Sequence, residues 1–92
     1  MAKQHQVLIG KKDMTKYVMA CLTMFNQEGA EEIVIKARGR LISRAVDVAE
    51  YLRNKVMKDV QVKEVRIGTE ALPGDDGGGN VSTIEIVIAR TK

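Results

Sequence analysis

Two short apolar runs, Val7-Leu8-Ile9 and Ile33-Val34-Ile35, flank a stretch of helical periodicity, and this pattern constrains the fold more than any other feature. Between the runs, apolar residues recur at helical spacing over about residues 14–28, with Asp13 as a potential N-cap and Gly29 as a stop. A strand–helix–strand unit normally forms a right-handed crossover that makes its strands parallel. We therefore predict a helix between two buried, parallel strands.

The second half of the chain predicts another helix and two further strands. Helical spacing of apolar residues extends over about residues 42–58. Residues 60–67 alternate between apolar and polar, but Lys63 and Glu64 break the phase, which predicts a β-bulge or strong twist. Residues 81–89 alternate cleanly and predict the last strand. The order is β-α-β-α-β-β, which indicates an α/β or α+β fold with two layers, helices packed on a sheet.

Size and composition indicate one small domain over residues 1–92, because 45% of the residues are apolar and 29% are charged. A domain of this size buries only about 60% of its unfolded surface, so pairing with a second copy would add stability. No apolar run reaches the roughly 18–20 residues of a membrane span, and the N-terminus lacks the apolar region of a secretory signal, so we expect a cytoplasmic protein without membrane contact.

Two basic loops follow the predicted parallel strands: Gly10-Lys11-Lys12 after the first and Lys36-Ala37-Arg38-Gly39-Arg40 after the second. Parallel strands of a crossover unit end at the same edge of the sheet, so the two loops should be neighbours. Each loop also opens a helix, whose N-terminus adds partial positive charge. The net charge of the whole chain is only +3, but this edge is predicted to bind the phosphate backbone of nucleic acid.

The residues do not predict an enzyme, a metal site or a cofactor. The single histidine, His5, lies in the N-terminal tail, and the single cysteine, Cys21, falls on the apolar stripe of a helix, where we expect an inert core residue. Tyr17 either shows its ring beside the basic loops or packs in the core. Three alternatives to duplex DNA stay open: an RNA-binding module, a small enzyme or metabolite binder for a phosphorylated ligand, and a purely structural dimer subunit.

Several segments in combination resemble the Alba family of archaeal chromatin proteins. They are Ile9-Gly10-Lys11-Lys12, Ile35-Lys36-Ala37-Arg38-Gly39-Arg40, Ser43-Arg44-Ala45-Val46-Asp47, Arg53-Asn54 and Val81-Ser82-Thr83-Ile84-Glu85-Ile86. The resemblance covers nearly the whole chain. It implies a chromosome-associated homodimer that binds double-stranded DNA with little sequence preference, and often RNA as well, with hairpin arms that reach along neighbouring minor grooves.

By position, the resemblance also assigns individual roles. Lys11 matches the lysine that family members use at the DNA centre, a reversible acetylation site in some of them, which would add an acetyltransferase and a deacetylase as partners. Lys12 matches the contact beside it, and Tyr17 matches an aromatic residue implicated in nucleic-acid contact. The complete set of expected nucleic-acid-binding residues is Lys11, Lys12, Lys16, Tyr17, Arg38, Arg40 and Arg44.

Two features depart from the family pattern. Val56 stands where relatives often place a phenylalanine in a dimer–dimer contact. Because valine offers less apolar surface, we expect weaker cooperative side-by-side packing of dimers on DNA. The segment 68–80, which we expect to be an exposed, mobile hairpin arm, carries Glu70, Asp75 and Asp76 but no basic residue. Because a narrow minor groove attracts cations, we expect this arm to contribute little affinity or to stay disordered in the complex.

Overall fold

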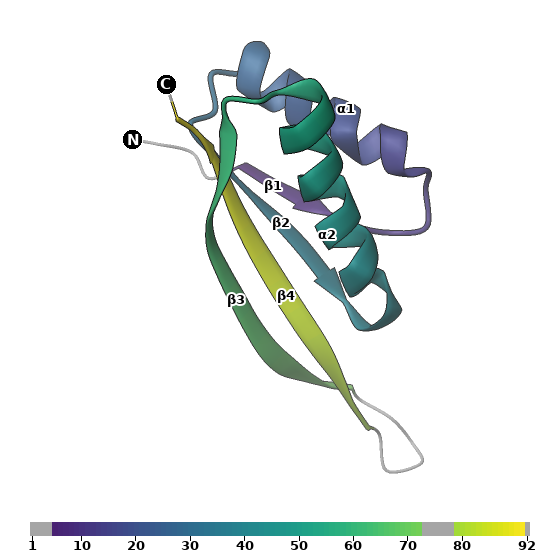
Figure 1. Cartoon of the computed structure of the whole chain (residues 1–92). Coiled ribbons are helices and arrows are strands. Elements are labelled where there is room, and N and C mark those ends of the chain that lie inside the picture. Colours follow the sequence, from purple (N-terminus) through teal and green to yellow (C-terminus); the bar gives the residue numbers. More distant parts are fainter. Residues whose placement is uncertain (1–4, 73–78, 92) are drawn as a thin grey trace.

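The computed structural model describes residues 5–72 and 79–91. Its helices and strands follow one another in the predicted order and form the predicted two-layer α+β architecture (Figure 1). Short helical segments precede and follow the second helix. The elements are β1 (His5–Leu8), α1 (Met14–Asn26), β2 (Glu32–Arg38), η1 (Gly39–Leu41), α2 (Ile42–Tyr51), η2 (Leu52–Val56), β3 (Val60–Leu72) and β4 (Gly79–Arg90).

The sheet has the strand order β1-β2-β4-β3. β1 and β2 are parallel, as the strand–helix–strand pattern predicts, whereas β4 is antiparallel to both of its neighbours, β2 and β3. Figure 1 shows both helices on one face of the sheet, and β3 and β4 continuing beyond them as a long hairpin. The opposite face has no helix over it in the described part of the chain, and we call it the open face.

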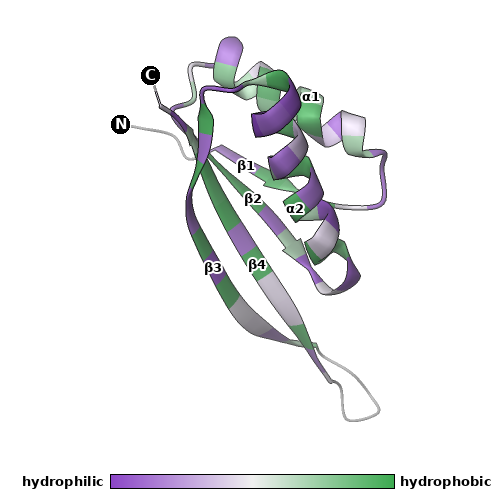
Figure 2. Ribbon diagram, viewed as in Figure 1, coloured by the Kyte–Doolittle hydropathy of each residue, from purple (hydrophilic) through white to green (hydrophobic). Residues whose placement is uncertain are grey.

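The core lies between the helices and the sheet, because successive side chains of each strand point to opposite faces and most of the apolar ones point toward the helices. The register places Ile33 opposite Ile88 and Ile35 opposite Ile86, so these four buried isoleucines share the face that the helices cover. Figure 2 shows the resulting alternation of hydrophobic and hydrophilic residues along the elements. The helices contribute the buried side chains of Tyr17, Val18, Cys21, Phe25, Ala45, Val48 and Ala49, and η2 contributes Leu52.

Cys21 is a core residue, as predicted. Its side chain is fully buried, and this burial raises the pKa of the thiol to about 12, so the nucleophilic thiolate is not populated at neutral pH. In residues 5–72 and 79–91, His, Cys, Asp and Glu side chains form no cluster of three that could hold a metal ion. The same residues include no helix with the length and apolar character to cross a lipid bilayer.

β2 is longer than predicted and takes in much of the second basic loop. Lys36 and Arg38 continue the alternation of β2 on the open face, because β4 pairs with the strand as far as Arg38. The turn that follows begins at Gly39, whose φ of 61° lies in the left-handed region that favours glycine. The prediction of a loop over residues 36–40 is therefore wrong for its first three residues.

The first helix ends two residues before the predicted boundary. The backbone N–H groups of Gln27 and Glu28 both donate to the carbonyl of Thr23, at 2.8 and 3.2 Å, and Gly29 with a φ of 69° completes the turn. Asp13 occupies the N-cap position of α1, but its side chain makes no capping hydrogen bond. The prediction of Asp13 as the N-cap residue is therefore confirmed for its position only.

The predicted break in alternation is a β-bulge. Val62 pairs with Ile88 and Glu64 pairs with Val87, so the register shifts at Lys63, as predicted. The predicted helix over about residues 42–58 is present as α2 followed by η2, whose backbone is π-helical.

The predicted exposed hairpin arm over residues 68–80 is present in its described residues, and the two strands extend further into it than predicted. Gly68–Leu72 belongs to β3 and pairs with β4, which begins at Gly79. Antiparallel pairing satisfies the backbone hydrogen-bonding groups of both strands. The hairpin can therefore continue beyond the part of the sheet whose side chains are buried in the core. Asp75 and Asp76 lie outside the described residues.

Candidate nucleic-acid interface

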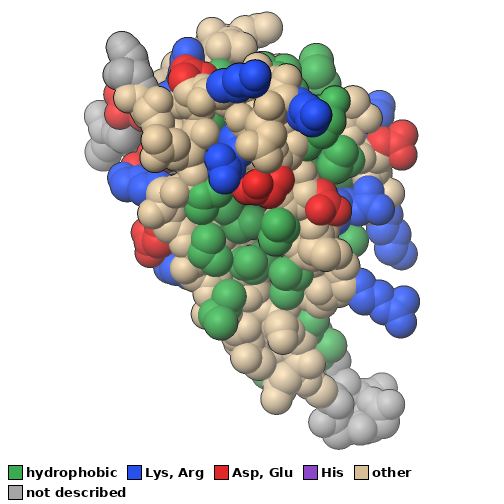
Figure 3. All heavy atoms as spheres, viewed as in Figure 1, with side chains coloured by type: hydrophobic (Ala, Val, Ile, Leu, Met, Phe, Trp, Pro, Cys, Tyr) green, Lys and Arg blue, Asp and Glu red, His purple; other side chains and the backbone are tan. Residues whose placement is uncertain are grey.

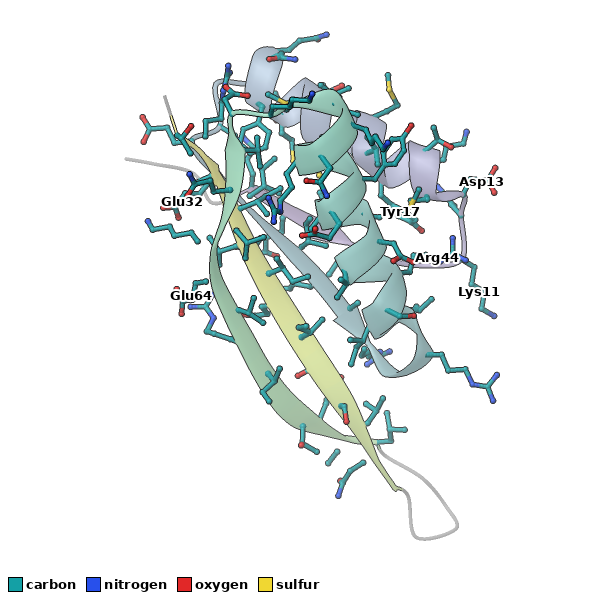
Figure 4. All side chains as sticks on the ribbon, viewed as in Figure 1. Lys11, Asp13, Tyr17, Glu32, Arg44 and Glu64 are labelled. Atoms are coloured by element: carbon teal, nitrogen blue, oxygen red, sulfur yellow. The ribbon has the colours of Figure 1, made fainter. Side chains whose placement is uncertain are left out.

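The two basic segments meet at one edge of the sheet, as predicted. Ile9, directly after β1, donates its backbone N–H to the carbonyl oxygen of Lys36 on β2, at 2.9 Å. Arg44 of α2 reaches across, and its Nη1 donates to the carbonyl oxygen of Lys12, at 3.1 Å. Figure 4 shows Lys11 and Arg44 projecting from this edge. Arg44 therefore holds the Gly10–Lys12 segment in place while its other N–H donors stay available.

The cations at this edge differ from most other cations in their pairing. Lys36, Arg38, Arg53, Lys63, Arg66 and Arg90 each form an ion pair with a carboxylate. Five cations at the edge form no ion pair within the described part of the chain, a property shared by Lys55 and Lys58 beyond α2. These five, Lys11, Lys12, Lys16, Arg40 and Arg44, are called the basic edge.

The basic edge is strongly positive and open to solvent. Lys11, Lys12, Lys16 and Arg40 are exposed, and Arg44 is half-buried. Figure 4 shows Asp13 on the same side of the molecule as Lys11 and Arg44, and its single negative charge offsets only part of the positive charge of the basic edge. Figure 3 shows Lys and Arg side chains projecting along the same side of the molecule. An unpaired cluster of this kind attracts polyanions without first having to break an internal ion pair.

Tyr17 anchors the Gly10–Lys12 segment from below. Its ring is only 8% exposed in the core, and its hydroxyl oxygen accepts hydrogen bonds from the backbone N–H groups of Gly10 (2.8 Å) and Lys12 (3.1 Å). A Cβ added at Gly10 would lie 3.1 Å from the same hydroxyl, so glycine lets the backbone approach it. The sequence left open whether Tyr17 faces the core or the basic loops. In the structure its ring packs in the core while its hydroxyl contacts the Gly10–Lys12 segment.

Replacing Tyr17 with phenylalanine is expected to loosen this segment. The change removes the acceptor of two backbone hydrogen bonds, so the free energy of unfolding should fall by about 1 kcal/mol, and the Gly10 and Lys12 amides should exchange their hydrogens faster. Denaturant unfolding and amide hydrogen exchange measure both effects. Tyr51→Phe is the matched control, because Tyr51 is exposed on α2. Equal exchange rates at Gly10 and Lys12 in the wild type and Tyr17→Phe would contradict the anchoring role.

Arg38 lies on the open face rather than in a loop, and it differs from the other expected binding residues. Its Nη1 is 2.7 Å from Oε1 of Glu70, on β3. Sequence reasoning missed this contact, because Glu70 is 32 residues away and reaches Arg38 only through the order in which the strands pair. The positions that hold Arg44 and Tyr17 were predicted, but their bonds to the Gly10–Lys12 backbone were not.

Comparison with known proteins identifies the family. The sequence pattern named Alba matches residues 5–69, well over half of the chain. The chain belongs to the Alba family. The DNA/RNA-binding protein Alba of Picrophilus torridus is 47% identical over 90 residues, which cover 98% of this chain and 100% of the relative. The DNA/RNA-binding protein Alba 1 of Archaeoglobus fulgidus is 51% identical over 87 residues, which cover 95% and 97%.

A solved Alba structure has the same fold. Alba from Thermoplasma volcanium superposes with a TM-score of 0.87 at 48% sequence identity, over 94% of this chain and 100% of that chain. The names of the two sequence relatives describe nucleic-acid-binding proteins and no enzyme, in agreement with the prediction that the chain is not an enzyme. The Alba pattern includes the whole basic edge and ends at residue 69, immediately before Glu70.

Proposed function

We propose that this protein is a chromatin architectural protein that binds double-stranded DNA as a homodimer, with little sequence specificity. The observation that carries the proposal is the gathering of five unpaired cations at the basic edge, from two segments about thirty residues apart. Its Alba relatives carry names that state DNA and RNA binding. Residues 1–92 act as one nucleic-acid-binding domain, in the cytoplasm and associated with the chromosome.

The basic edge suits the phosphate backbone better than the bases. Lysine and arginine side chains that neutralise phosphates release condensed counterions, and this gain is the same for every sequence. The aromatic residues argue against a stacking platform for single strands, because Tyr17 and Phe25 are buried and only Tyr51 is exposed. Structured RNA remains the second candidate, since it presents a similar phosphate array and the relatives are named for both nucleic acids.

An exposed apolar surface supports the homodimer. Val65 and Ile67 on β3 are 51% and 82% exposed, and they pair with Ile86 and Ile84 of β4 on the face that the helices only partly cover. Figure 3 shows hydrophobic side chains gathered over the middle of the β3–β4 hairpin, beside α2. A second copy of the chain would cover this surface and double the number of cations available to one duplex.

Lys11 is the residue through which binding is regulated in this proposal. Its side chain is exposed and forms no ion pair with the described residues, so a modifying enzyme can reach it. Acetylation by an acetyltransferase would remove one positive charge per subunit, and a deacetylase would restore it. The expected effect is a modest weakening that acts equally on all DNA sequences.

Salt-dependent binding to duplex DNA tests the proposal. If about four cations per subunit contact phosphate, a dimer engages about eight, and the logarithm of the binding constant should fall with the logarithm of salt concentration at a slope of about −7. Fluorescence anisotropy with several unrelated duplexes at four salt concentrations measures the slope and the sequence preference. Competition by structured RNA distinguishes an RNA-binding module from a DNA-binding protein. Competition by a mononucleotide tests for a metabolite binder, since a protein that binds the phosphate backbone should not bind a mononucleotide. A slope near zero would rule out the electrostatic mechanism.

A further inference from the structure

The ion pair between Arg38 and Glu70 sets Arg38 apart from the other expected binding residues. Arg38 is the only one of them that pairs with a carboxylate within residues 5–72 and 79–91. Both side chains are on the surface, 60% and 52% exposed, and their atoms lie 2.7 Å apart. The cation that the sequence predicts to meet phosphate therefore already holds an anion that the protein itself supplies.

The strand order creates this pair. Arg38 on β2 lies opposite Thr83 on β4, which lies opposite Gly68 on β3, and Glu70 is the next residue of β3 on the same face. Neighbouring strands are about 4.8 Å apart, so Arg38 has to reach across β4 to the second strand. Gly68 has no side chain to block the way. Glu70 is thus the carboxylate that the sheet offers to Arg38 from across the hairpin.

Solvent and ligands can reach the pair. Arg38 and Glu70 both line an open hollow of about 690 Å³, with Lys36, Thr69 and Glu85 among its other lining residues. Lys36 forms an ion pair with Glu85, with its Nζ 3.5 Å from Oε2 of the carboxylate. A phosphate group that enters the hollow from the adjacent basic edge can therefore approach the Arg38 guanidinium directly, but it meets Glu70 as a competitor.

We propose that Glu70 is an affinity-determining residue that competes with nucleic-acid phosphate for Arg38. The inference rests on the proposed function and deepens it, because it names a residue that limits binding at the same interface. In free protein, Arg38 is neutralised by Glu70, and it contributes to binding only after the pair opens. The freed Glu70 carboxylate then gathers a counterion, which offsets the counterion release that the new phosphate contact provides.

Neutralising Glu70 should consequently change both the affinity and its salt dependence. Exposed ion pairs are weak, so Glu70→Gln is expected to tighten duplex binding by only about two- to fivefold for each subunit. The salt slope should become steeper by about one for each subunit, because Arg38 then releases a counterion with no compensating uptake at Glu70. Both changes are expected only when Arg38 is present. This dependence distinguishes competition between Glu70 and phosphate for Arg38 from a general effect of losing a negative charge.

Four variants measured beside the wild type test the proposal: Glu70→Gln, Arg38→Gln, the double variant, and Glu64→Gln. Glu64 is the control for the loss of one carboxylate from β3: it pairs with Arg66 at 3.3 Å, and Arg66 keeps its second partner, Glu85, at 3.1 Å. Figure 4 shows Glu64 on the side of the molecule opposite Lys11 and Arg44. Duplex affinity by anisotropy at four salt concentrations is the readout, and thermal unfolding establishes that every variant is folded.

The proposal expects tighter binding and a steeper slope for Glu70→Gln, little change for Glu64→Gln, and no gain from Glu70→Gln once Arg38 is already glutamine. It is overturned if Glu70→Gln binds like the wild type, if Glu64→Gln gains as much, or if the gain persists without Arg38. Failure of the proposed function looks different, since the wild-type protein itself would then show no salt-dependent duplex binding.

Discussion

Replacing Lys11, Lys12, Arg38 and Arg40 together with alanine is expected to weaken duplex binding by at least about a thousandfold at 0.1 M salt. At a salt exponent of about 0.9 per contact, each phosphate contact contributes close to a factor of ten at this concentration. A dimer would lose about six such contacts from Lys11, Lys12 and Arg40, besides the weaker contribution of Arg38, which is paired with Glu70. All four side chains are exposed, so the fold should survive their removal. Anisotropy measures the affinity, and far-ultraviolet circular dichroism measures the fold.

A second quadruple variant controls for net charge. Arg53, Lys55, Lys58 and Arg90 lie outside the basic edge, and their replacement with alanine removes the same charge from each subunit. If binding depends on where the cations lie, this variant should keep most of the affinity. An equal loss in both variants would mean that total charge governs binding. Unchanged affinity in the variant of Lys11, Lys12, Arg38 and Arg40 would mean that DNA binds through another surface.

Replacing Val65 and Ile67 together with aspartate is expected to convert the protein to a monomer. Each apolar side chain that a partner covers stabilises the dimer by about 1.5–3 kcal/mol, and a twofold dimer contains four of them, so the dissociation constant should rise more than a thousandfold. A charge in that contact adds a desolvation cost. Sedimentation equilibrium at micromolar concentration should then give the chain mass of 10.2 kDa, against twice that value for the wild type.

The matched control moves the same substitutions to other exposed apolar residues. Leu8 on β1 and Met19 on α1 are exposed and lie outside the β3–β4 hairpin, so their double aspartate variant should remain a dimer. The monomeric variant should still bind DNA, but with about half the salt slope, because one basic edge replaces two. A dimer that persists with Val65 and Ile67 both changed would place the contact elsewhere.

Much of the site could be predicted because it depends on one general rule. The handed crossover makes β1 and β2 parallel, so Lys11, Lys12 and Arg40 come to one edge whatever the rest of the fold does. The phase break at Lys63 is equally local, since it can be read from the alternation of a single strand, and the register shift appears there. Both successes rely on periodicities of neighbouring residues.

The pairing of distant segments was beyond such rules. Nothing in residues 60–90 by themselves indicates that β4 inserts between β2 and β3, and the Arg38–Glu70 pair exists only because of that insertion. The extension of β2 through Arg38 also requires β4 as a hydrogen-bonding neighbour, which sequence reasoning did not supply. Tyr17 could be placed on its helix but not assigned its two bonds to the backbone of Gly10 and Lys12.

The sequence by itself determined the order of the elements and the charges that each turn carries, because helical and strand periodicities and turn residues are written in consecutive positions. Tertiary structure decided which of those charges are free. Whether a cation meets a carboxylate depends on strand order and register, which bring Glu70 to Arg38 and Glu85 to Lys36 but leave Lys11, Lys12 and Arg40 unpaired among the described residues.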